Sequence, residues 1–454
     1  MPGPFFAYPT CLFAAGPETT LQPLLVQLTV VIVAARLGGA AARWLRQPTV
    51  VGEIVAGLVL GPSVLGKLAP GLSAAIFGGD AAAPALEAAL AGFSQVGLIL
   101  LLFLVGIEFD FSHIRREGRA AAAVSIAGVA VPFTLALGLA ALMAPRLESL
   151  GATDSIDHRT FALFLGTAMS ITAIPILGRI LIEMGLQHTP LGAIVIAAAA
   201  CDDAIGWTLL AAVSAIAVGQ FEPASVLRML GATMLLAAVM LLAVRPLALP
   251  RLERTLEGSR AAAGGQRPRL PLGALSIVLA ALFMAALLTS LIGIFAIFGA
   301  FLLGAALSGS PRLREAVSDQ LSDFVTVFFL PIFFTSTGLR TDVGTLGSAE
   351  AWGWCAAVMA VAVLGKWGGC GMAAWLSGMP AGEAACVGVL MNTRALMELI
   401  VVNVGMDLGV IPPAVYCMLV LMAIGTTIMA TPLASWLLRG SRHERQLVDR
   451  GFLR

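Results

Sequence analysis

The chain has 454 residues, of which 59% are hydrophobic and 12% are charged, and its net charge is +1. Because soluble domains carry about 25% charged residues, this composition excludes an ordinary soluble enzyme and indicates a polytopic membrane protein. The small net charge gives no electrostatic reason to expect nucleic-acid binding. The six cysteines stand singly, without metal-ligand spacing, and no cofactor is expected.

Long apolar segments recur along the whole chain. A bilayer core of about 30 Å requires about 20 apolar residues per helix. By that measure we expect an all-α fold with about thirteen transmembrane helices. In chain order the predicted spans cover residues 21–42, 49–66, 90–109, 120–143, 161–184, 191–218, 224–244, 272–289, 291–307, 324–339, 351–376, 384–404 and 414–438.

The basic residues predict how the chain is oriented. If the N-terminus is outside, the inner loops and the tail hold eighteen arginines, whereas the outer loops hold four basic residues. This bias follows the positive-inside rule. We therefore expect a multi-pass protein of the cell membrane (inner or plasma membrane), with the C-terminus in the cytoplasm. The Arg-rich segment 251–269 is expected to be a linker between two halves.

The two halves resemble each other weakly. The third span ends in Gly-Ile-Glu-Phe-Asp (106–110) and the tenth in Gly-Leu-Arg-Thr-Asp (338–342). Two spans later, each half has a polar interruption, at residues 170–175 and 392–394. Seven spans separate the partners, and an odd offset reverses their direction. The pattern indicates inverted repeats, a construction that is common among secondary transporters.

Two adjacent acids, Asp202 and Asp203, lie near the middle of the sixth span. A charge at the bilayer centre is costly and usually faces a cavity or a partner. Neighbouring helix residues project about 100° apart, so one acid can face another helix while the other faces a cavity. A carboxylate in this setting can exchange a proton for a cation. The alternative is a structural polar pair packed against other helices.

Lys366 also lies in the middle of a span, within Val-Leu-Gly-Lys-Trp-Gly-Gly-Cys-Gly. Only two of the 27 basic residues are lysines, so arginine serves wherever charge alone is needed. A buried lysine can release its proton, whereas arginine cannot. We therefore expect a role in ion or proton binding. The alternative is a lysine that extends its side chain to the membrane surface.

The fifth span contains Ser170, Thr172 and Pro175. Proline removes a backbone donor and frees a carbonyl one turn earlier. A helix broken here would present carbonyl groups and half-helix dipoles to an ion, and the two hydroxyls would add oxygens. We therefore expect a discontinuous helix that presents oxygens, including the Thr172 hydroxyl, to an ion.

The twelfth span has its interruption at Asn392 and Thr393, which we expect to form the second discontinuous helix. Arg394 and Glu398 follow with a spacing of four residues. That spacing places them on one helix face. A structural ion pair is the favoured interpretation, with ion binding as the alternative.

Seven motifs follow one another in chain order and run across nearly the whole chain. They are Gly-Glu-Ile-Val-Ala-Gly-Leu-Val-Leu-Gly-Pro-Ser (52–63), Leu-Phe-Leu-Val-Gly-Ile-Glu-Phe-Asp (102–110), Ser-Ile-Thr-Ala-Ile-Pro-Ile-Leu-Gly-Arg-Ile-Leu (170–181), Asp-Asp (202–203), Phe-Phe-Thr-Ser-Thr-Gly-Leu (333–339), Lys366 and Asn-Thr-Arg-Ala-Leu-Met-Glu-Leu-Ile (392–400). As a set they resemble the cation/proton antiporter superfamily, specifically its second family, which holds NapA-like, Kef-like and plant exchangers.

The resemblance implies one membrane transporter domain over residues 1–454, with the NhaA/NapA-like fold and two discontinuous helices that cross near the acids. It also implies a homodimer in the lipid bilayer and, from where the chain ends, no C-terminal regulatory domain. The dimerisation or scaffold part is expected at 21–66 and 272–307, with a linker helix at 224–244. The ion-translocating core is expected at 90–218 and 324–438.

The resemblance further implies a role for each charged residue. Asp203 is expected to carry the monovalent cation, with Thr172 as a further ligand, and to carry the proton in exchange. Asp202 is expected to pair with Lys366. Members with this Asp-Asp-Lys set are expected to be electrogenic. Relatives often have glycine where this chain has Ala395, so the second break is expected to be less open.

The expected function is therefore exchange of a monovalent cation for protons by alternating access, and not enzymatic catalysis. Sodium is favoured, and potassium or lithium remain open. A passive or gated cation channel and a non-transporting sensor are the alternatives. An intramembrane aspartyl protease needs two Asp on different helices, often with a Gly-x-Gly-Asp pattern. Here Asp202 and Asp203 are neighbours on one helix, and the pattern does not occur.

Overall fold

The computed structural model describes residues 17–45, 47–77, 83–108, 118–151, 156–172, 174–186, 189–217, 223–262, 269–293 and 295–449. Its regular elements within these ranges are all helical, as the sequence predicts. Ten of the described helices are long and apolar enough to cross a bilayer. The side chains that remain exposed on them are largely apolar, as a lipid environment requires.

Three predicted spans do not correspond to one full-length helix. The fifth and twelfth are broken in the middle, and the ninth is the short apolar helix α14 (Ala296–Leu307). Before α14, α13 (Leu272–Ile292) ends at Gly293, whose φ of 96° suits glycine and turns the chain sharply. The number of thirteen crossings therefore stays a prediction.

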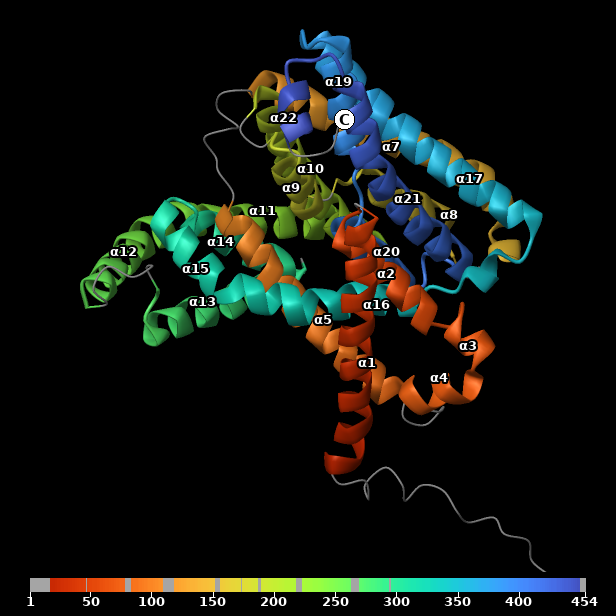
Figure 1. The fold of residues 1–454 in the computed structure, drawn as a ribbon, viewed down its shortest axis with the longest axis horizontal. Helices are drawn as coiled ribbons and strands as arrows, with labels where there is room; N and C mark the ends of the chain where they lie inside the picture. The colour runs from red at the N-terminus through yellow and green to blue at the C-terminus, as the bar shows by residue number, and fades with distance from the viewer. Residues whose placement is uncertain are drawn as a thin grey trace, which may run out of the picture.

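One group of helices in Figure 1 is called here the scaffold bundle, and close contacts at glycines hold it together. A Cβ added at Gly338 would lie 2.2 Å from the Ile54 carbonyl oxygen, and one added at Gly106 would lie 2.3 Å from the Phe301 carbonyl oxygen. Only glycine allows backbones to approach this closely. The bundle consists of α1 (Pro17–Trp44), α2 (Thr49–Leu60), α5 (Ala83–Glu108), α13, α14, α15 (Pro311–Phe324) and α16 (Leu330–Leu339).

The second group, called here the acidic bundle, contains both broken helices and the acid pair. Its members pack mainly on one another, and in Figure 1 α7, α8, α17 and α21 lie together above α5, α13 and α16. The bundle consists of α7 (Gly118–Met143), α8 (His158–Ser170), α9 (Ile174–Glu183), α10 (Pro190–Ala217), α17 (Ala349–Val363), α18 (Gly369–Leu376), α19 (Ala381–Met391), α20 (Leu396–Asp407) and α21 (Pro413–Leu437).

This packing differs from the boundaries predicted for the two parts. Helices α5 and α16 lie within the predicted core ranges 90–218 and 324–438, but they pack mainly on α14 and α2. The physical reason is the pair of glycine contacts, which join each helix to the scaffold backbone. The division into two moving parts itself stays a prediction, with α5 and α16 on the scaffold side.

The glycine crossings also follow the predicted repeat. Helix α5 packs on α14 in the way that α16 packs on α2. The two members of each corresponding pair, α2 with α14 and α5 with α16, are seven predicted spans apart. Asp110, which closes the first repeat motif, lies outside the described residues, whereas Asp342 caps the turn after α16 through the Gly344 backbone N–H.

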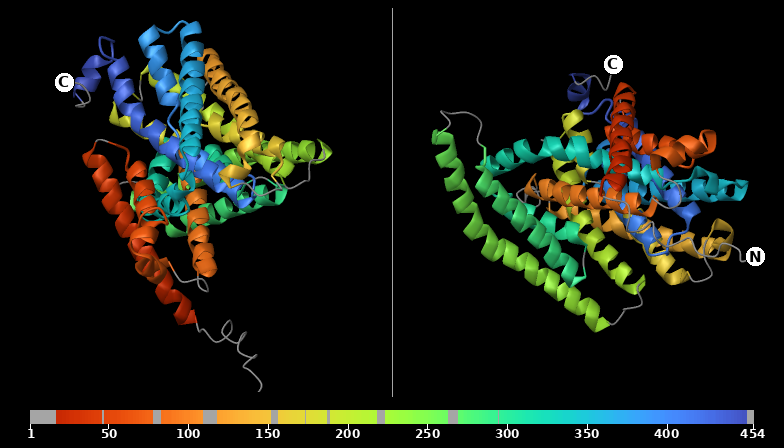
Figure 2. Two further views of the ribbon diagram at one scale, coloured as in Figure 1. Left: turned by 90° about the vertical axis from the view of Figure 1, so that its right-hand side faces the viewer. Right: turned by 90° about the horizontal axis from the view of Figure 1, so that it is seen from below.

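A long helix stands at the edge of the molecule, beside α13 (Figure 2, right). It is formed by α11 (Pro223–Val239), the π-helical turn η3 (Met240–Val244) and α12 (Arg245–Ala262). The predicted linker 251–269 is therefore helical in its first part, up to residue 262. Leucine, glutamate and arginine are strong helix formers, so the charged sequence 251–257 continues the helix beyond the apolar span. The remaining described helices are α3 (Leu65–Leu68), α4 (Pro70–Phe77) and α22 (Glu444–Asp449).

Candidate functional site

The two broken helices open at the residues predicted for them. Helix α8 ends at Ser170 and α9 begins at Ile174, with residue 173 outside the described residues. Pro175 is the second residue of α9, where its missing N–H leaves no hydrogen bond unmade. Helix α19 ends at Met391 and α20 begins at Leu396. Each break leaves backbone carbonyls without helical partners.

Side chains from each break satisfy carbonyls of the other. Arg394 donates to the Ala168 carbonyl at 3.3 Å and to the Met169 carbonyl at 2.7 Å, in the last turn of α8. Thr172 donates to the carbonyl of Met391, the last residue of α19, at 3.0 Å. The two interruptions therefore cross and cap one another.

Asp202, on α10 beside this crossing, accepts hydrogen bonds from three side chains on three different segments. Its Oδ2 lies 2.5 Å from Lys366 Nζ and 2.9 Å from Thr172 Oγ1, and its Oδ1 lies 2.7 Å from Ser125 Oγ. All four side chains are buried. Both carboxylate oxygens of Asp202 therefore have hydrogen-bond donors.

Asp203 is buried to the same degree, with 1% of its surface exposed, but its surroundings are different. Neither of its carboxylate oxygens has a hydrogen-bond partner among the described residues. Thr172, predicted to share a cation with Asp203, hydrogen-bonds Asp202 instead. One acid of the pair is thus held by hydrogen bonds, and the other is not.

Lys366 stands on a π-helical turn, η6 (Leu364–Gly368), between α17 and α18. Such turns occur frequently at functional sites. Helix α7 lies opposite Lys366 and approaches it closely because residue 128 is glycine. A Cβ at Gly128 would lie 2.6 Å from Cys370 Sγ and 3.5 Å from Lys366 Nζ. The small residue leaves the space in which the lysine reaches Asp202.

Arg394 and Glu398 are both buried, and their charged atoms Nη1 and Oε2 lie 3.8 Å apart. This distance is that of an ion pair without a hydrogen bond. Within the described part of the chain, the Glu398 oxygens have no hydrogen-bond partner. The Arg394 guanidinium therefore hydrogen-bonds mainly to the carbonyls of α8, and the sequence did not reveal this role.

The other predicted residues of the breaks make local contacts. Ser170 donates to the Gly166 carbonyl and Thr393 to the Leu390 carbonyl, each within its own helix end. The amide oxygen of Asn392 accepts from Arg394 Nε at 3.3 Å. Ala395 has an extended φ of 177°, which any residue adopts, so its replacement of glycine does not prevent the break.

Sequence reasoning missed Ser125, because one serine in an apolar helix has no distinguishing pattern. It also missed a polar network between the two bundles at the end of α16. There Arg340 pairs with Asp407 and donates to Asn403 at 3.3 Å, and Tyr416 donates to Asn403 at 2.9 Å. Only the fold brings these distant residues together.

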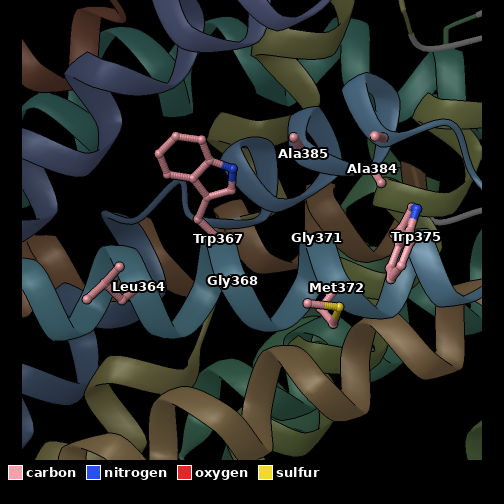
Figure 3. Close-up of a pocket in the computed structure, with 9 residues that line it drawn as sticks. Leu364, Trp367, Gly368, Gly371, Met372, Trp375, Ala384 and Ala385 are labelled. Atoms are coloured by element: carbon pink, nitrogen blue, oxygen red, sulfur yellow. The ribbon is translucent and has the colours of Figure 1, made fainter.

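A cavity of about 350 Å³ opens on the outer side of η6, α18 and α19 (Figure 3). Its lining is apolar, with Trp367, Met372 and Trp375 around it. Asp202, Asp203 and Lys366 do not line it. The cavity is therefore separate from the acid pair.

The buried charges beside the crossing define what the site can do. Asp202 is matched by Lys366 and Glu398 by Arg394, which leaves the charge of Asp203 unmatched. An unmatched ionised carboxylate is costly in a buried site, so a proton or a cation must neutralise it. No group of three or more His, Cys, Asp or Glu side chains in the described ranges could hold a metal ion.

A helical membrane protein with two crossing broken helices and a buried acid pair belongs to the class of secondary transporters. The chain is a member of the sodium/hydrogen exchanger family, since the family model for the transmembrane sodium/hydrogen exchanger matches residues 29–440.

Two relatives illustrate this membership, and one solved structure has a similar fold. The chain is 39% identical to the Na(+)/H(+) antiporter NhaS4 of Synechocystis sp. over 91% of this chain and 97% of the relative. It is 35% identical to Cation/H(+) antiporter 17 of Arabidopsis thaliana over 95% of this chain, and spans about half the length of that relative (50%). The fold resembles the sodium proton antiporter MjNhaP1 of Methanocaldococcus jannaschii, with a TM-score of 0.58 at 14% identity, over 95% of this chain and 100% of that one.

Proposed function

We propose that the chain is a secondary active transporter that exchanges a monovalent cation for protons, with Asp203 carrying each in turn. The observation that carries this proposal is the contrast within the acid pair. Asp202 has three donors, whereas the equally buried Asp203 has no hydrogen-bond partner among the described residues. Because proton and cation neutralise the same carboxylate, they compete for it, and binding of one releases the other.

Sodium is the proposed cation, because the family description and the name of the cyanobacterial relative both refer to it. Potassium and lithium remain to be compared. The oxygens available beside Asp203 are those of the crossing, and Thr172 is the proposed second ligand. Its hydroxyl lies 2.9 Å from Asp202 Oδ2, on the adjacent residue of α10. A rotation of this hydroxyl away from Asp202 would let its oxygen accept the cation.

Alternating access is proposed to come from movement of the acidic bundle against the scaffold bundle. The scaffold is fixed by backbone contacts at glycines, whereas the polar contacts of Arg340 with Asp407 and Asn403 join the two bundles through exposed side chains. Ion pairs and hydrogen bonds between exposed side chains are weak, so they can break and form again. We further propose a homodimer formed through the scaffold, in the cell membrane, with the N-terminus outside and the C-terminus in the cytoplasm.

Exchange is proposed to be electrogenic through Lys366. If the lysine releases its proton when the cation binds Asp203, two protons move for one cation, and one net charge crosses the membrane. The membrane potential then contributes about 2.3 kcal/mol per 100 mV for that charge. Lysine suits this role because a buried ammonium can lose its proton, which a guanidinium does not.

The test is exchange by the purified protein in liposomes after a pH jump, with Na⁺, K⁺ and Li⁺ compared, and with and without a clamped voltage. We expect cation-dependent proton flux, fastest with sodium and sensitive to voltage. Current without proton counterflow would identify a channel instead. Absence of any ion flux would favour a sensor.

The charge carried by Lys366 has its own test in the same liposomes. Lys366→Gln removes the proton but leaves a side chain that can hydrogen-bond Asp202. We expect that an imposed membrane potential no longer accelerates cation/proton exchange by this variant. Exchange that stays voltage-sensitive in Lys366→Gln would show that another group moves the charge.

A further inference from the structure

We propose that Ser125 is a positioning residue that holds Asp202 as an anion, in place, while Lys366 leaves it. The inference deepens the proposed exchange mechanism and rests on it, because a lysine that releases a proton must separate from its acid in each cycle. The question is which hydrogen-bond donors remain on Asp202 when Lys366 has moved away.

The donors around Asp202 are divided between its two oxygens. Lys366 and Thr172 both approach Oδ2, at 2.5 Å and 2.9 Å, whereas Ser125 alone approaches Oδ1, at 2.7 Å. Loss of the lysine therefore leaves Oδ1 as it was. Ser125 is 1% exposed, so water at its surface does not compete for the hydroxyl.

Thr172 is a less secure donor than Ser125. A hydroxyl has one proton to donate. That of Thr172 has two acceptors within reach, Asp202 Oδ2 at 2.9 Å and the Met391 carbonyl at 3.0 Å. The hydrogen bond that the structure gives to Ser125 goes to Asp202. Ser125 can therefore stay on the acid when Thr172 turns to the second broken helix or to a cation.

The energetic reason for such a donor is the cost of an unpaired buried charge. Removing one partner of a buried ion pair is strongly destabilising, because the other charge remains without compensation. Hydrogen bonds to an ionised group are about twice as strong as neutral ones and favour the charged form. The Ser125 hydroxyl thus lowers the barrier to separating Lys366 from Asp202.

Ser125 and Lys366 also belong to different helices that are fixed to each other. On α7, the Val124 carbonyl accepts from Cys370 Sγ at 3.6 Å. A Cβ at Gly365 would lie 2.9 Å from Pro132 Cα, so η6 and α7 are in backbone contact. The lysine can move only by rotation of its own long side chain, which leaves the serine where it is.

The first test reads the protonation of Asp202 by infrared spectroscopy, in an Asp203→Asn background that removes the neighbouring acid. We compare Lys366→Gln with Lys366→Gln plus Ser125→Ala. We expect a carboxylic-acid band to appear only when both changes are present, and to disappear when Asp202→Asn is added. If the band is absent with both changes, or already present with Lys366→Gln alone, the proposal is overturned.

The second test is a double-mutant cycle on exchange in liposomes, with Asp203 intact. Ser125→Ala should slow exchange about tenfold to a hundredfold, the effect of one hydrogen bond to a charged group, and should slow Lys366→Gln by a larger factor. Ser125→Thr, which keeps the hydroxyl, should restore the rate. Equal losses in both backgrounds, or no rescue by threonine, would mark Ser125 as merely structural and overturn the proposal.

Two further outcomes separate the proposals from each other and from misfolding. If the wild type shows no exchange while the infrared band behaves as expected, the proposed function is overturned and the positioning of Asp202 by Ser125 stands. If Ser125→Ala does not yield folded protein, Ser125→Cys, a weak donor of similar size, takes its place with the same expectations.

Discussion

The crossing of α2 with α16 and the crossing of the two broken helices are both close approaches of buried backbone, but different residues build them. At the first, Gly57 and Gly338 let two intact helices touch, and Thr335 of α16 donates to the Glu53 backbone carbonyl of α2 at 3.3 Å. At the second, both helices end, and Arg394 and Thr172 donate hydrogen bonds to carbonyls that have no helical partner. The first arrangement keeps both helices continuous, whereas the second leaves backbone carbonyls that side chains must satisfy.

The difference indicates why the acid pair lies where it does. A continuous helix presents no free backbone group to an ion. At the broken helices, Thr172 stands between a free carbonyl and Asp202, so the acid, the lysine and the break form one hydrogen-bonded unit. The glycine crossings hold the frame against which such a unit can move.

The largest effect is expected at the polar crossing. Arg394→Met leaves two carbonyls of α8 without a donor and Glu398 without a countercharge. We expect the free energy of unfolding to fall by about 3–5 kcal/mol, as for other buried pairs that lose one partner. The measurement is unfolding in detergent micelles.

A second variant separates the two causes of this loss. Adding Glu398→Gln to Arg394→Met removes the unpaired charge but leaves the carbonyls open. We expect partial recovery of stability. Complete recovery would show that Arg394 serves only Glu398, and that the capping of α8 contributes nothing.

At the glycine crossing the expected effect is smaller. The Cβ in Gly338→Ala would meet the Ile54 carbonyl oxygen at 2.2 Å, so α2 and α16 must move apart. Overpacking of this kind costs about 1–3 kcal/mol. The control is Gly353→Ala on α17, where a Cβ meets nothing within 4 Å and alanine favours the helix. Equal melting temperatures for the two variants would contradict the account of this crossing.

The smallest effect is expected at the start of α8, outside the membrane-spanning part. The Thr160 hydroxyl, with the backbone N–H groups of Thr160 and Arg159, donates to Asp157 and lowers the pKa of its carboxyl. A carboxyl whose pKa is lower in the folded state stabilises that state above its unfolded pKa of about 3.9, and the benefit is lost as the pH falls through the folded value.

Asp157→Ala should therefore cost about 1 kcal/mol at neutral pH, the usual value of a helix cap. The difference from the wild type should shrink below about pH 4, where the acid is protonated in both states. Melting temperatures of both proteins across this pH range provide the check. A difference that stays constant to low pH would mean that the charge of Asp157 does not matter.

The sequence was sufficient for features with a local signature. Apolar length predicted the all-helical membrane fold, and the polar residues around Thr172 and Asn392 predicted where two helices break. It was insufficient where the partner is distant. The glycines of α5 and α16 do not reveal which helix they touch, and the predicted core boundaries therefore included both.

The same limit applies within the site. The acids and Lys366 stood out because charges are rare in apolar spans, so their positions could be predicted. Ser125 is as buried as they are, but a serine fits any helix and gives no signal of its own. Which acid has the donors also depends on the rotation of α10 against α7 and η6, and only the three-dimensional packing determines that.

The central claim is that the two adjacent acids have different roles: Asp203 carries the cation and the proton, and Asp202 pairs with Lys366. One measurement tests this claim most directly. Asp203→Asn and Asp202→Asn are compared in the same liposomes for cation-dependent proton flux and for binding of the cation. The account predicts that Asp203→Asn abolishes both, while Asp202→Asn keeps cation binding at Asp203. Cation-dependent proton flux that persists in Asp203→Asn would contradict it.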